Sequence, residues 1–166
     1  MNHEQGRSIA DRIQTIEDER DIVQVLYAYG RALDYGPLES FLDVFEEDGR
    51  WERVASKLPP KSFEKHSGLE KMWTVHTHAP DYFHKHTVLN PIVEVDGDEA
   101  HASSYLVFIC DHPDGPYIRA FSRCQDWLVR SVDRKWRIRE RRAELESWSS
   151  HNYPPPPWQG LPAIVE

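Results

Sequence analysis

The chain has 166 residues, of which 39% are hydrophobic, 29% charged and 11% aromatic, and its formal net charge is −8. This length predicts a single domain with a sizeable core, because single domains typically contain ~100–200 residues. The aromatic content argues against disorder, and the acidic balance argues against a nucleic-acid partner, which needs a basic face. We therefore expect one folded domain over residues 1–150, followed by a proline-rich tail over residues 151–166.

The two cysteines, Cys110 and Cys124, fit no close-spaced metal motif and are too few for a disulfide framework. We predict that both are free thiols in a reducing compartment. No apolar run approaches the ~20 residues of a membrane span, and the first residues lead into an amphipathic helix rather than an apolar signal core. These features predict a cytoplasmic protein without a membrane partner.

The chain begins with a helical pattern. Apolar residues recur mostly every three or four positions from Ile9 to Leu33, and Ser8 stands where it can cap the first turn. We expect this helix in two pieces that meet near Asp18, with a glycine and a proline ending it at residues 36–37. The elements expected next are a short helix with its apolar face at residues 38–45, a turn at 46–49, a short strand at 51–54 and a third helix at 63–77.

After residue 80 the periodicity changes to that of strands. Four β-rich segments follow, separated by turn residues: His84–Val95, Ala100–Cys110, Tyr117–Arg130 and Lys135–Leu145. Helices followed by long strands are typical of an α+β fold, in which helices cover one face of a mostly antiparallel sheet.

Charged residues alternate with others along the last of these segments. Arg137, Arg139 and Arg141 are spaced by two and therefore share one face of a regular strand. We interpret that face as a solvated or interfacial surface on which the arginines pair with acidic neighbours.

Four histidines, His76, His78, His84 and His86, lie close together in the sequence and raise the question of a metal. His84 and His86 point to the same face of a strand, because side chains alternate. However, no acidic or cysteine ligand stands at a usual metal spacing, and His76 and His78 lie two apart at a helix end, pointing different ways. We predict no metal and no cofactor.

Three segments together carry a resemblance to a known family. They are VLYAYGRALDYGPLESFLDVFEEDGRWE at 25–52, HKHTVLNPIVEVDGDEAHASSYLVF at 84–108 and DWLVRSVDRKWRIRERR at 126–142. In order and spacing they resemble the SnoaL-like branch of the nuclear-transport-factor-2-like superfamily, over residues 9–148. The resemblance implies a cone-shaped fold, in which a strongly curved, mostly antiparallel sheet is wrapped by three N-terminal helices and encloses an apolar pocket.

Within that superfamily the chain is similar to scytalone dehydratase and hexachlorocyclohexane dehydrochlorinase, which share a histidine–aspartate dyad. The family aspartate ends the first long helix, which places it at Asp34, and the family histidine lies four residues before an asparagine on the first long strand, which places it at His86 with Asn90. Two positions depart from scytalone dehydratase. Its second histidine corresponds to Ser104 here, and the tyrosine before its aspartate is Leu33, so dehydration of its substrate is not implied.

The residue types of the dyad indicate a chemistry of their own. A neutral imidazole with a reference pKa of ~6.5 is suited to remove a proton near pH 7. An aspartate on one ring nitrogen fixes the tautomer and stabilises the imidazolium that forms. On this hypothesis Asp34 orients and His86 abstracts the proton. The alternative is that Asp34 bonds to the turn after its helix and His86 is an ordinary buried sheet histidine.

The resemblance also points to the residues that line the pocket. If Ser104 takes the family's inward position, strand alternation places Ala100, Ala102, Leu106 and Phe108 on the same face. The candidate substrate-binding residues are Tyr29, Trp51, Trp73, Asn90, Ser104, Leu106 and Phe108. Asn90 precedes a proline and could instead shape a bulge. Arg119 and Arg142 are cationic candidates for an anionic group, with surface placement as the alternative.

Two hypotheses for function remain open. The first is a cofactor-independent lyase or isomerase, of the dehydratase or dehydrohalogenase type, acting on an apolar small molecule such as an aromatic or polycyclic compound. The second is a non-catalytic small-molecule-binding or assembly subunit, like the β-subunits of aromatic-ring dioxygenases, which share this fold. In either case we expect a homo-oligomer, for example a trimer.

Overall fold

The computed structural model describes residues 8–149; the predicted proline-rich tail at 151–166 lies outside them. In chain order the elements are α1 (Ile9–Tyr35), α2 (Leu38–Leu42), β1 (Phe45–Ala55), β2 (Leu58–Glu64), α3 (Lys65–Thr74), β3 (His84–Asp96), β4 (Glu99–Cys110), β5 (Tyr117–Arg130) and β6 (Trp136–Trp148). The strands form one six-stranded sheet in the order β2-β1-β6-β5-β4-β3. Neighbouring strands are antiparallel except β1 and β6, which are parallel. The α+β prediction is therefore confirmed, with a sheet that is curved but not closed.

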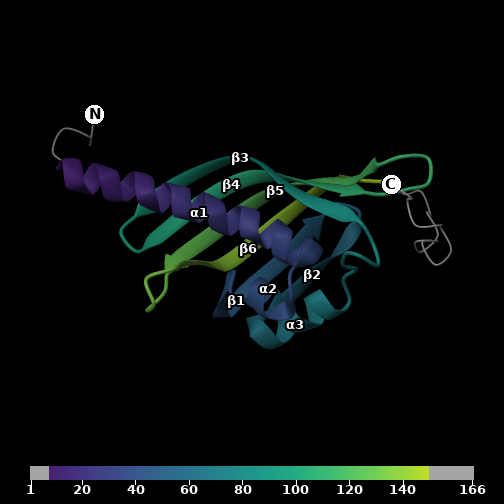
Figure 1. Cartoon of the computed structure of the whole chain (residues 1–166), viewed down its shortest axis with the longest axis horizontal. Helices are drawn as coiled ribbons and strands as arrows, with labels where there is room; N and C mark the ends of the chain where they lie inside the picture. The colour runs from purple at the N-terminus through teal and green to yellow at the C-terminus, as the bar shows by residue number, and fades with distance from the viewer. Residues whose placement is uncertain (1–7, 150–166) are drawn as a thin grey trace.

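Helix α1 lies across one face of the sheet, and α2 and α3 cover the same face near β1 and β2 (Figure 1). Helix α1 starts with a capping box, in which the Ser8 side chain accepts a hydrogen bond from the Asp11 backbone N–H and the Asp11 carboxylate accepts one from the Ser8 backbone N–H. The helix is continuous, so the predicted division near Asp18 is wrong. In the second half of the expected apolar stripe, Ile22, Leu26, Tyr29 and Leu33 are buried. In the first half, Ile9 and Ile16 are 74% and 64% exposed, because this end of the helix projects past the sheet (Figure 1).

The first two strands differ from the expectation. Residues 46–49 belong to β1 rather than to a turn, although the pairing of β1 with β6 is irregular between Phe45 and Arg50. Strand β2 was not predicted, because Pro59 and Pro60 cannot donate hydrogen bonds to a ladder. The structure places β2 at the edge of the sheet, where that loss is tolerated. Helix α3 is shorter than expected and follows β2 directly.

The predicted inner face of β4 is confirmed by burial. Ala100, Ala102, Ser104 and Leu106 are buried, while Tyr105 between them is 52% exposed. The four long strands lie within three residues of their predicted ends. The turn residues that separate the four segments account for this agreement.

Strand β6 does not keep a regular alternation. Consecutive residues of β5 pair with Glu140 and Ile138, so Arg139 is the extra residue of a β-bulge. The bulge moves the following residues to the opposite face, and Arg141 is completely buried. The prediction that Arg137, Arg139 and Arg141 share a solvated face is therefore wrong for Arg141.

Helix α1 and strand β3 approach each other closely at Gly30. A Cβ atom at this position would overlap the carbonyl oxygen of His86. The absence of a side chain thus allows the last turns of α1 to lie directly against β3. This contact sets the distance between the end of α1 and the first residues of β3. Within residues 8–149 no helix is long and apolar enough to cross a membrane.

Candidate active site

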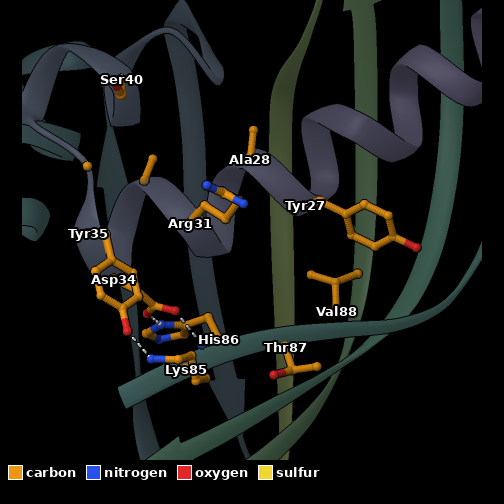
Figure 2. Close-up of a pocket in the computed structure, with 12 residues that line it drawn as sticks. Tyr27, Ala28, Arg31, Asp34, Tyr35, Ser40, Lys85, His86, Thr87 and Val88 are labelled. Carbon is orange, nitrogen blue, oxygen red and sulfur yellow. Dashed lines mark hydrogen bonds and ion pairs between the residues drawn. The ribbon is translucent and has the colours of Figure 1, made fainter. Parts of the chain in front are cut away.

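The structure brings Asp34 and His86 together, as the resemblance implies. Asp34 comes from the last turn of α1 and His86 from β3. The Asp34 Oδ1 atom lies 2.6 Å from His86 Nδ1, and Asp34 Oδ2 accepts the backbone N–H of His86 at 2.9 Å. Figure 2 shows the two side chains pointing toward each other between helix and strand. Two bonds from one carboxylate hold the imidazole and its backbone as a unit.

The electrostatics of the pair favour a neutral imidazole. Burial alone would raise the pKa of Asp34, but the contacts of its carboxylate with the His84 and His86 rings and with the His86 backbone N–H hold that pKa well below its usual value. Burial lowers the pKa of His86, and the Asp34 charge opposes this only in part. Near neutral pH, Asp34 is ionised and accepts from Nδ1–H of a neutral His86. The Nε2 lone pair of His86 is then left free to accept a proton.

A second histidine, His84, contacts the same carboxylate. Its Nε2 lies 3.2 Å from Asp34 Oδ1, and its side chain is completely buried. The His84 and His86 rings meet edge to face with centroids 5.4 Å apart. Asp34 is therefore flanked by two imidazoles from the same face of β3, which confirms the shared face expected for these two residues.

An inner cavity of about 530 Å³ lies between the sheet and the helices. It is lined by aromatic, aliphatic and basic side chains: Tyr29, Leu33, Trp51, Arg53, Leu58, Lys61, Phe63, Met72, Val75, His76, His86, Leu106, Phe108, Arg119, Ala120, Ser122, Ala143, Leu145 and Trp148. The His86 ring stacks on Phe108 with centroids 4.5 Å apart and meets Tyr29 edge to face. The imidazole is thus part of the cavity wall, and the volume suits a small-molecule ligand.

Four of the predicted substrate-binding residues line this cavity: Tyr29, Trp51, Leu106 and Phe108. Trp51 donates from Nε1 to the Tyr29 hydroxyl at 3.1 Å. Burial raises the pKa of Tyr29 to about 12. The phenol therefore stays protonated and acts as wall and hydrogen-bond partner, without a role as a base.

The other three predicted substrate-binding residues lie outside the cavity lining. Asn90 is exposed with φ of 50°, in the bulge where the pairing of β3 with β4 shifts, so it shapes the strand. Trp73 stacks on His78 with centroids 4.2 Å apart. Ser104 is buried on the inner face of β4, but away from the cavity surface.

The two cationic candidates are separated by the sheet. Arg119 lines the cavity, and its Nη1 donates to the Ser149 carbonyl at 2.8 Å. Arg142 is exposed and lies 3.4 Å from Glu52. Arg119 thus fits a role near a ligand, whereas Arg142 takes the surface alternative.

His76 and His78 point different ways, as expected from the sequence, but the neighbours of His76 were not predicted. His78 lies within hydrogen-bond distance of the Leu33 and Trp73 carbonyl oxygens. His76 instead packs against His84 and His86, with ring centroids 5.0 and 5.1 Å away. Burial lowers its pKa to about 3. The contact of His76 with His84 and His86 arises because β3 passes the end of α3 in the folded chain, so no local sequence pattern predicts it.

A second hollow lies outside, between α1 and β3, and is drawn in Figure 2. This outer groove has a volume of about 830 Å³ and includes Tyr27, Arg31 and Lys85 in its wall. Lys85 donates to the Tyr35 hydroxyl across it. His86 lines both the groove and the inner cavity, whereas Asp34 lines only the groove. The dyad therefore forms part of the partition between them, and the aromatic wall favours the inner cavity for an apolar ligand.

Another buried ion pair lies deeper in the core. Arg141 donates from Nε and Nη2 to the two carboxylate oxygens of Asp126, at 2.7 and 3.0 Å, and both side chains are completely buried. The Arg141 guanidinium also lies 4.0 Å from the centre of the Tyr29 ring. This pair therefore supports the inner side of Tyr29 and has no opening of its own to the cavity.

Solved structures with the same fold were found across bacteria. A nuclear-transport-factor-2-like protein with a cystatin-like fold from Novosphingobium aromaticivorans aligns with a TM-score of 0.72 at 20% identity, covering 87% of this chain and 92% of its own. A Mycobacterium tuberculosis protein of unknown function aligns at 0.71 and 25% identity, covering 84% and 77%. A protein from N. aromaticivorans, described as the β subunit of an aromatic-ring-hydroxylating dioxygenase, aligns at 0.68 and 19% identity, covering 81% and 93%.

No curated protein matches the sequence. The family model described as a SnoaL-like domain matches residues 14–142, which include both members of the dyad and nearly the whole sheet. The chain therefore belongs to the SnoaL-like domain family, and it has the fold of the nuclear-transport-factor-2-like protein described above.

Proposed function

We propose that the protein is a cofactor-independent lyase or isomerase, in which His86 removes a proton from carbon and Asp34 orients it. The observation that carries this proposal is the short Asp34 Oδ1 to His86 Nδ1 contact of 2.6 Å beside an apolar cavity. It leaves Nε2 as the only acceptor on the ring. General-base catalysis of this kind contributes ~10²–10⁴-fold to a rate.

The cavity lining supports an apolar substrate, such as an aromatic or polycyclic compound. Trp51, Phe63, Phe108 and Tyr29 present aromatic surface, and the volume of about 530 Å³ accommodates several fused rings. Arg119 supplies a cation in the same wall. A leaving group or enolate oxygen that gains negative charge would be stabilised by such a cation. The choice between elimination and isomerisation then depends on whether the substrate carries a leaving group.

The test uses exchange of carbon-bound hydrogen for deuterium, which requires the base but no leaving group. Aromatic and polycyclic ketones that raise the unfolding temperature would be selected first, because specific binding stabilises the folded state. Their exchange in D₂O would then be followed by NMR. Wild-type protein is expected to accelerate exchange, and His86→Ala to lose roughly 10²–10⁴-fold of that acceleration. Equal exchange by a correctly folded His86→Ala variant would contradict the proposal.

A second candidate is a non-catalytic subunit, favoured by the fold shared with the dioxygenase β subunit. Such a subunit has no need for a base in the cavity. Purification from the native source distinguishes the two. A fixed stoichiometry with a larger iron-containing chain would favour the subunit, whereas assembly from identical chains, for example a trimer, is the result expected for the enzyme.

A further inference from the structure

Three histidines from two parts of the chain meet at the cavity wall. His76 follows the end of α3, and His84 and His86 lie at the start of β3. One ring nitrogen from each lies within 4.8 Å of the other two. The three ring centroids are 5.0, 5.1 and 5.4 Å apart, so the cluster is nearly equilateral.

Each ring has one nitrogen placed against an oxygen, which leaves the other nitrogen with a lone pair. His76 Nδ1 lies 2.7 Å from the Thr77 carbonyl oxygen, and His86 Nδ1 lies 2.6 Å from Asp34. His84 Nε2 lies 3.2 Å from Asp34. The remaining atoms are His76 Nε2, His86 Nε2 and His84 Nδ1. Carboxylates and carbonyls that orient histidines in this way are the usual outer partners of metal-binding imidazoles.

His84 provides an independent sign that a ligand is missing from this set. Its side chain is completely buried. Neither of its ring nitrogens makes a hydrogen bond of good geometry to any residue in the described range 8–149. A buried polar atom without a partner is costly, and the proposed dyad gives His84 no task. A cation bound by Nδ1 would satisfy it.

We propose that His76, His84 and His86 form a binding site for a divalent transition metal ion such as Zn²⁺. Three neutral imidazoles are the ligand type preferred by Zn²⁺, Co²⁺ and Ni²⁺. Zn–N bonds of about 2.0–2.1 Å place tetrahedral ligand atoms about 3.3 Å apart, so nitrogens that lie up to 4.8 Å apart have to approach each other by up to about 1.5 Å. The fourth position opens on the inner cavity, which His76 and His86 both line.

This site departs from the expectation drawn from the sequence, which considered all four histidines and predicted no metal. The structure brings three of the four together, His76, His84 and His86, and leaves His78 out. A bound ion would occupy the Nε2 atom of His86, so metal binding and proton abstraction by that atom exclude each other. The metal-site proposal can be tested independently of the proposed activity, because metal binding is measured on the protein without a substrate.

The test titrates untagged, chelator-treated full-length protein with Zn²⁺ by calorimetry and with Co²⁺ by visible absorption. The expected result is one ion per chain and the absorption of four-coordinate Co²⁺. His76→Ala and His84→Ala are expected to abolish stoichiometric binding. The matched control is His101→Ala, because His101 lies on the exposed face of β4 against Trp127 and far from the cluster in the sheet.

Two further readouts keep the proposal falsifiable if a variant folds poorly. His76→Gln retains most of the side-chain volume and is expected to lose the metal as well. In wild-type protein, Zn²⁺ should shift the imidazole NMR signals of His76, His84 and His86 and no others. Asp34→Asn should weaken binding by about 10- to 100-fold, as loss of an outer partner does. Absence of stoichiometric binding by wild-type protein, or unchanged binding by a folded His76→Ala variant, would overturn the proposal.

A failure here is distinguishable from a failure of the proposed function. Deuterium exchange is measured in metal-free protein and depends on His86 and Asp34, whereas metal binding also depends on His76 and His84. If both proposals hold, adding Zn²⁺ to wild-type protein should suppress exchange in proportion to occupancy. Full exchange with the site saturated would contradict metal coordination by His86.

Discussion

Two buried carboxylates in this molecule have similar surroundings but different partners. Asp34 accepts from His86 at the cavity wall, and Asp126 accepts from Arg141 deeper in the core. Both are nearly inaccessible to solvent. The guanidinium of Arg141 is always protonated, whereas His86 carries a proton on one nitrogen and a lone pair on the other. The partner therefore decides whether the carboxylate serves structure or proton transfer.

The position of each pair on the sheet adds to this difference. His86 faces the cavity and stacks on Phe108. Arg141 is covered by Tyr29, and its charge is matched by two hydrogen bonds to Asp126. The first pair has an atom free for a substrate or a metal, whereas the second lies away from the cavity surface. We expect substitutions at the first to change activity more than stability, and at the second to do the reverse.

The largest expected effect is that of Asp34→Asn on the proposed reaction. An amide keeps the size of the side chain but removes the charge that stabilises the imidazolium. It also replaces one of the two acceptor oxygens with a donor, so the His86 Nδ1–H and the His86 backbone N–H can no longer both be satisfied. Exchange of carbon-bound hydrogen should fall by roughly 10²–10⁴-fold. The free energy of unfolding in urea should fall by less than in Asp126→Ala, because His86 is neutral and no buried charge is left without a partner. A large loss of stability together with wild-type hydrogen exchange would contradict this expectation and would assign the Asp34 and His86 pair a structural role.

Asp126→Ala should show the opposite behaviour. It leaves the Arg141 charge buried without a partner, and breaking a buried pair in this way costs about 3–5 kcal/mol in the free energy of unfolding. Urea denaturation measures this loss. The matched control is the double variant Asp126→Leu with Arg141→Met, which removes both charges and should recover most or all of the stability. Equal destabilisation by the single and double variants would show that packing, and not the unpaired charge, is responsible.

Much of the fold was predictable because the relevant patterns are local and long. The strand patterns predicted the bounds of β4 and β5, and the Ser8 cap predicted the start of α1. The inner face of β4 followed from alternation once the family's inward position was assigned to Ser104. Asp34 and His86 were found through resemblance, since 52 positions separate them in sequence. Their contact could be predicted only from the resemblance to the family, because local periodicity carries no information on tertiary contacts.

The parts that were missed depend on interruptions of a pattern. The bulge at Arg139 moves the following residues of β6 to the opposite face of the sheet and buries Arg141, and no glycine or other turn residue in the sequence marks its position. Asn90 takes a left-handed conformation in a second bulge and leaves the inner face. The contact of His76 with the β3 histidines arises only when α3 and β3 are packed together. Such features follow from register and packing rather than from propensity.

A smaller effect is expected from Gly30→Ala, which tests how closely the dyad depends on helix placement. Alanine normally stabilises a helix interior by about 1 kcal/mol relative to glycine. Here its Cβ would overlap the carbonyl oxygen of His86, so α1 has to move away from β3. We expect a loss of about 1–3 kcal/mol in the free energy of unfolding. Deuterium exchange should fall as well, because the shift lengthens the contact between Asp34 and His86.

Ala28→Gly is a suitable control for this substitution, because it changes the same helix in the opposite sense. It should reduce stability through helix propensity by about 1 kcal/mol. Exchange per folded molecule should stay normal, since the contact at Gly30 is preserved. If Gly30→Ala were more stable than wild-type protein, α1 and β3 would not approach as closely as the structure shows.

The smallest expected effect concerns Asp18, a third buried carboxylate, which shares helix α1 with Asp34 but has an arginine partner. Asp18 Oδ2 lies 2.7 Å from Arg130 Nη2, and Trp136 donates to Oδ1 at 3.2 Å. Burial by itself would raise the pKa of Asp18, but these hydrogen bonds and the Arg130 charge lower it below its usual value of 3.8. The folded state therefore holds this proton more weakly than the unfolded state. The resulting stabilisation is complete above about pH 4 and is lost as the pH falls through the lowered pKa.

Asp18→Asn should accordingly reduce stability at neutral pH and flatten its decline below pH 4, by at most about 1.4 kcal/mol per pH unit for one proton. Urea unfolding at several pH values measures both effects. Asp21→Asn on the same helix is the matched control, because the ion pair of Asp21 with Arg20 is exposed and contributes little. If Asp18→Asn lowered hydrogen exchange as much as Asp34→Asn does, the effect on activity would depend on location in α1 rather than on the partner of the carboxylate. If Asp18→Asn lowered stability alone, Asp18 would behave like Asp126, the other carboxylate that is paired with an arginine.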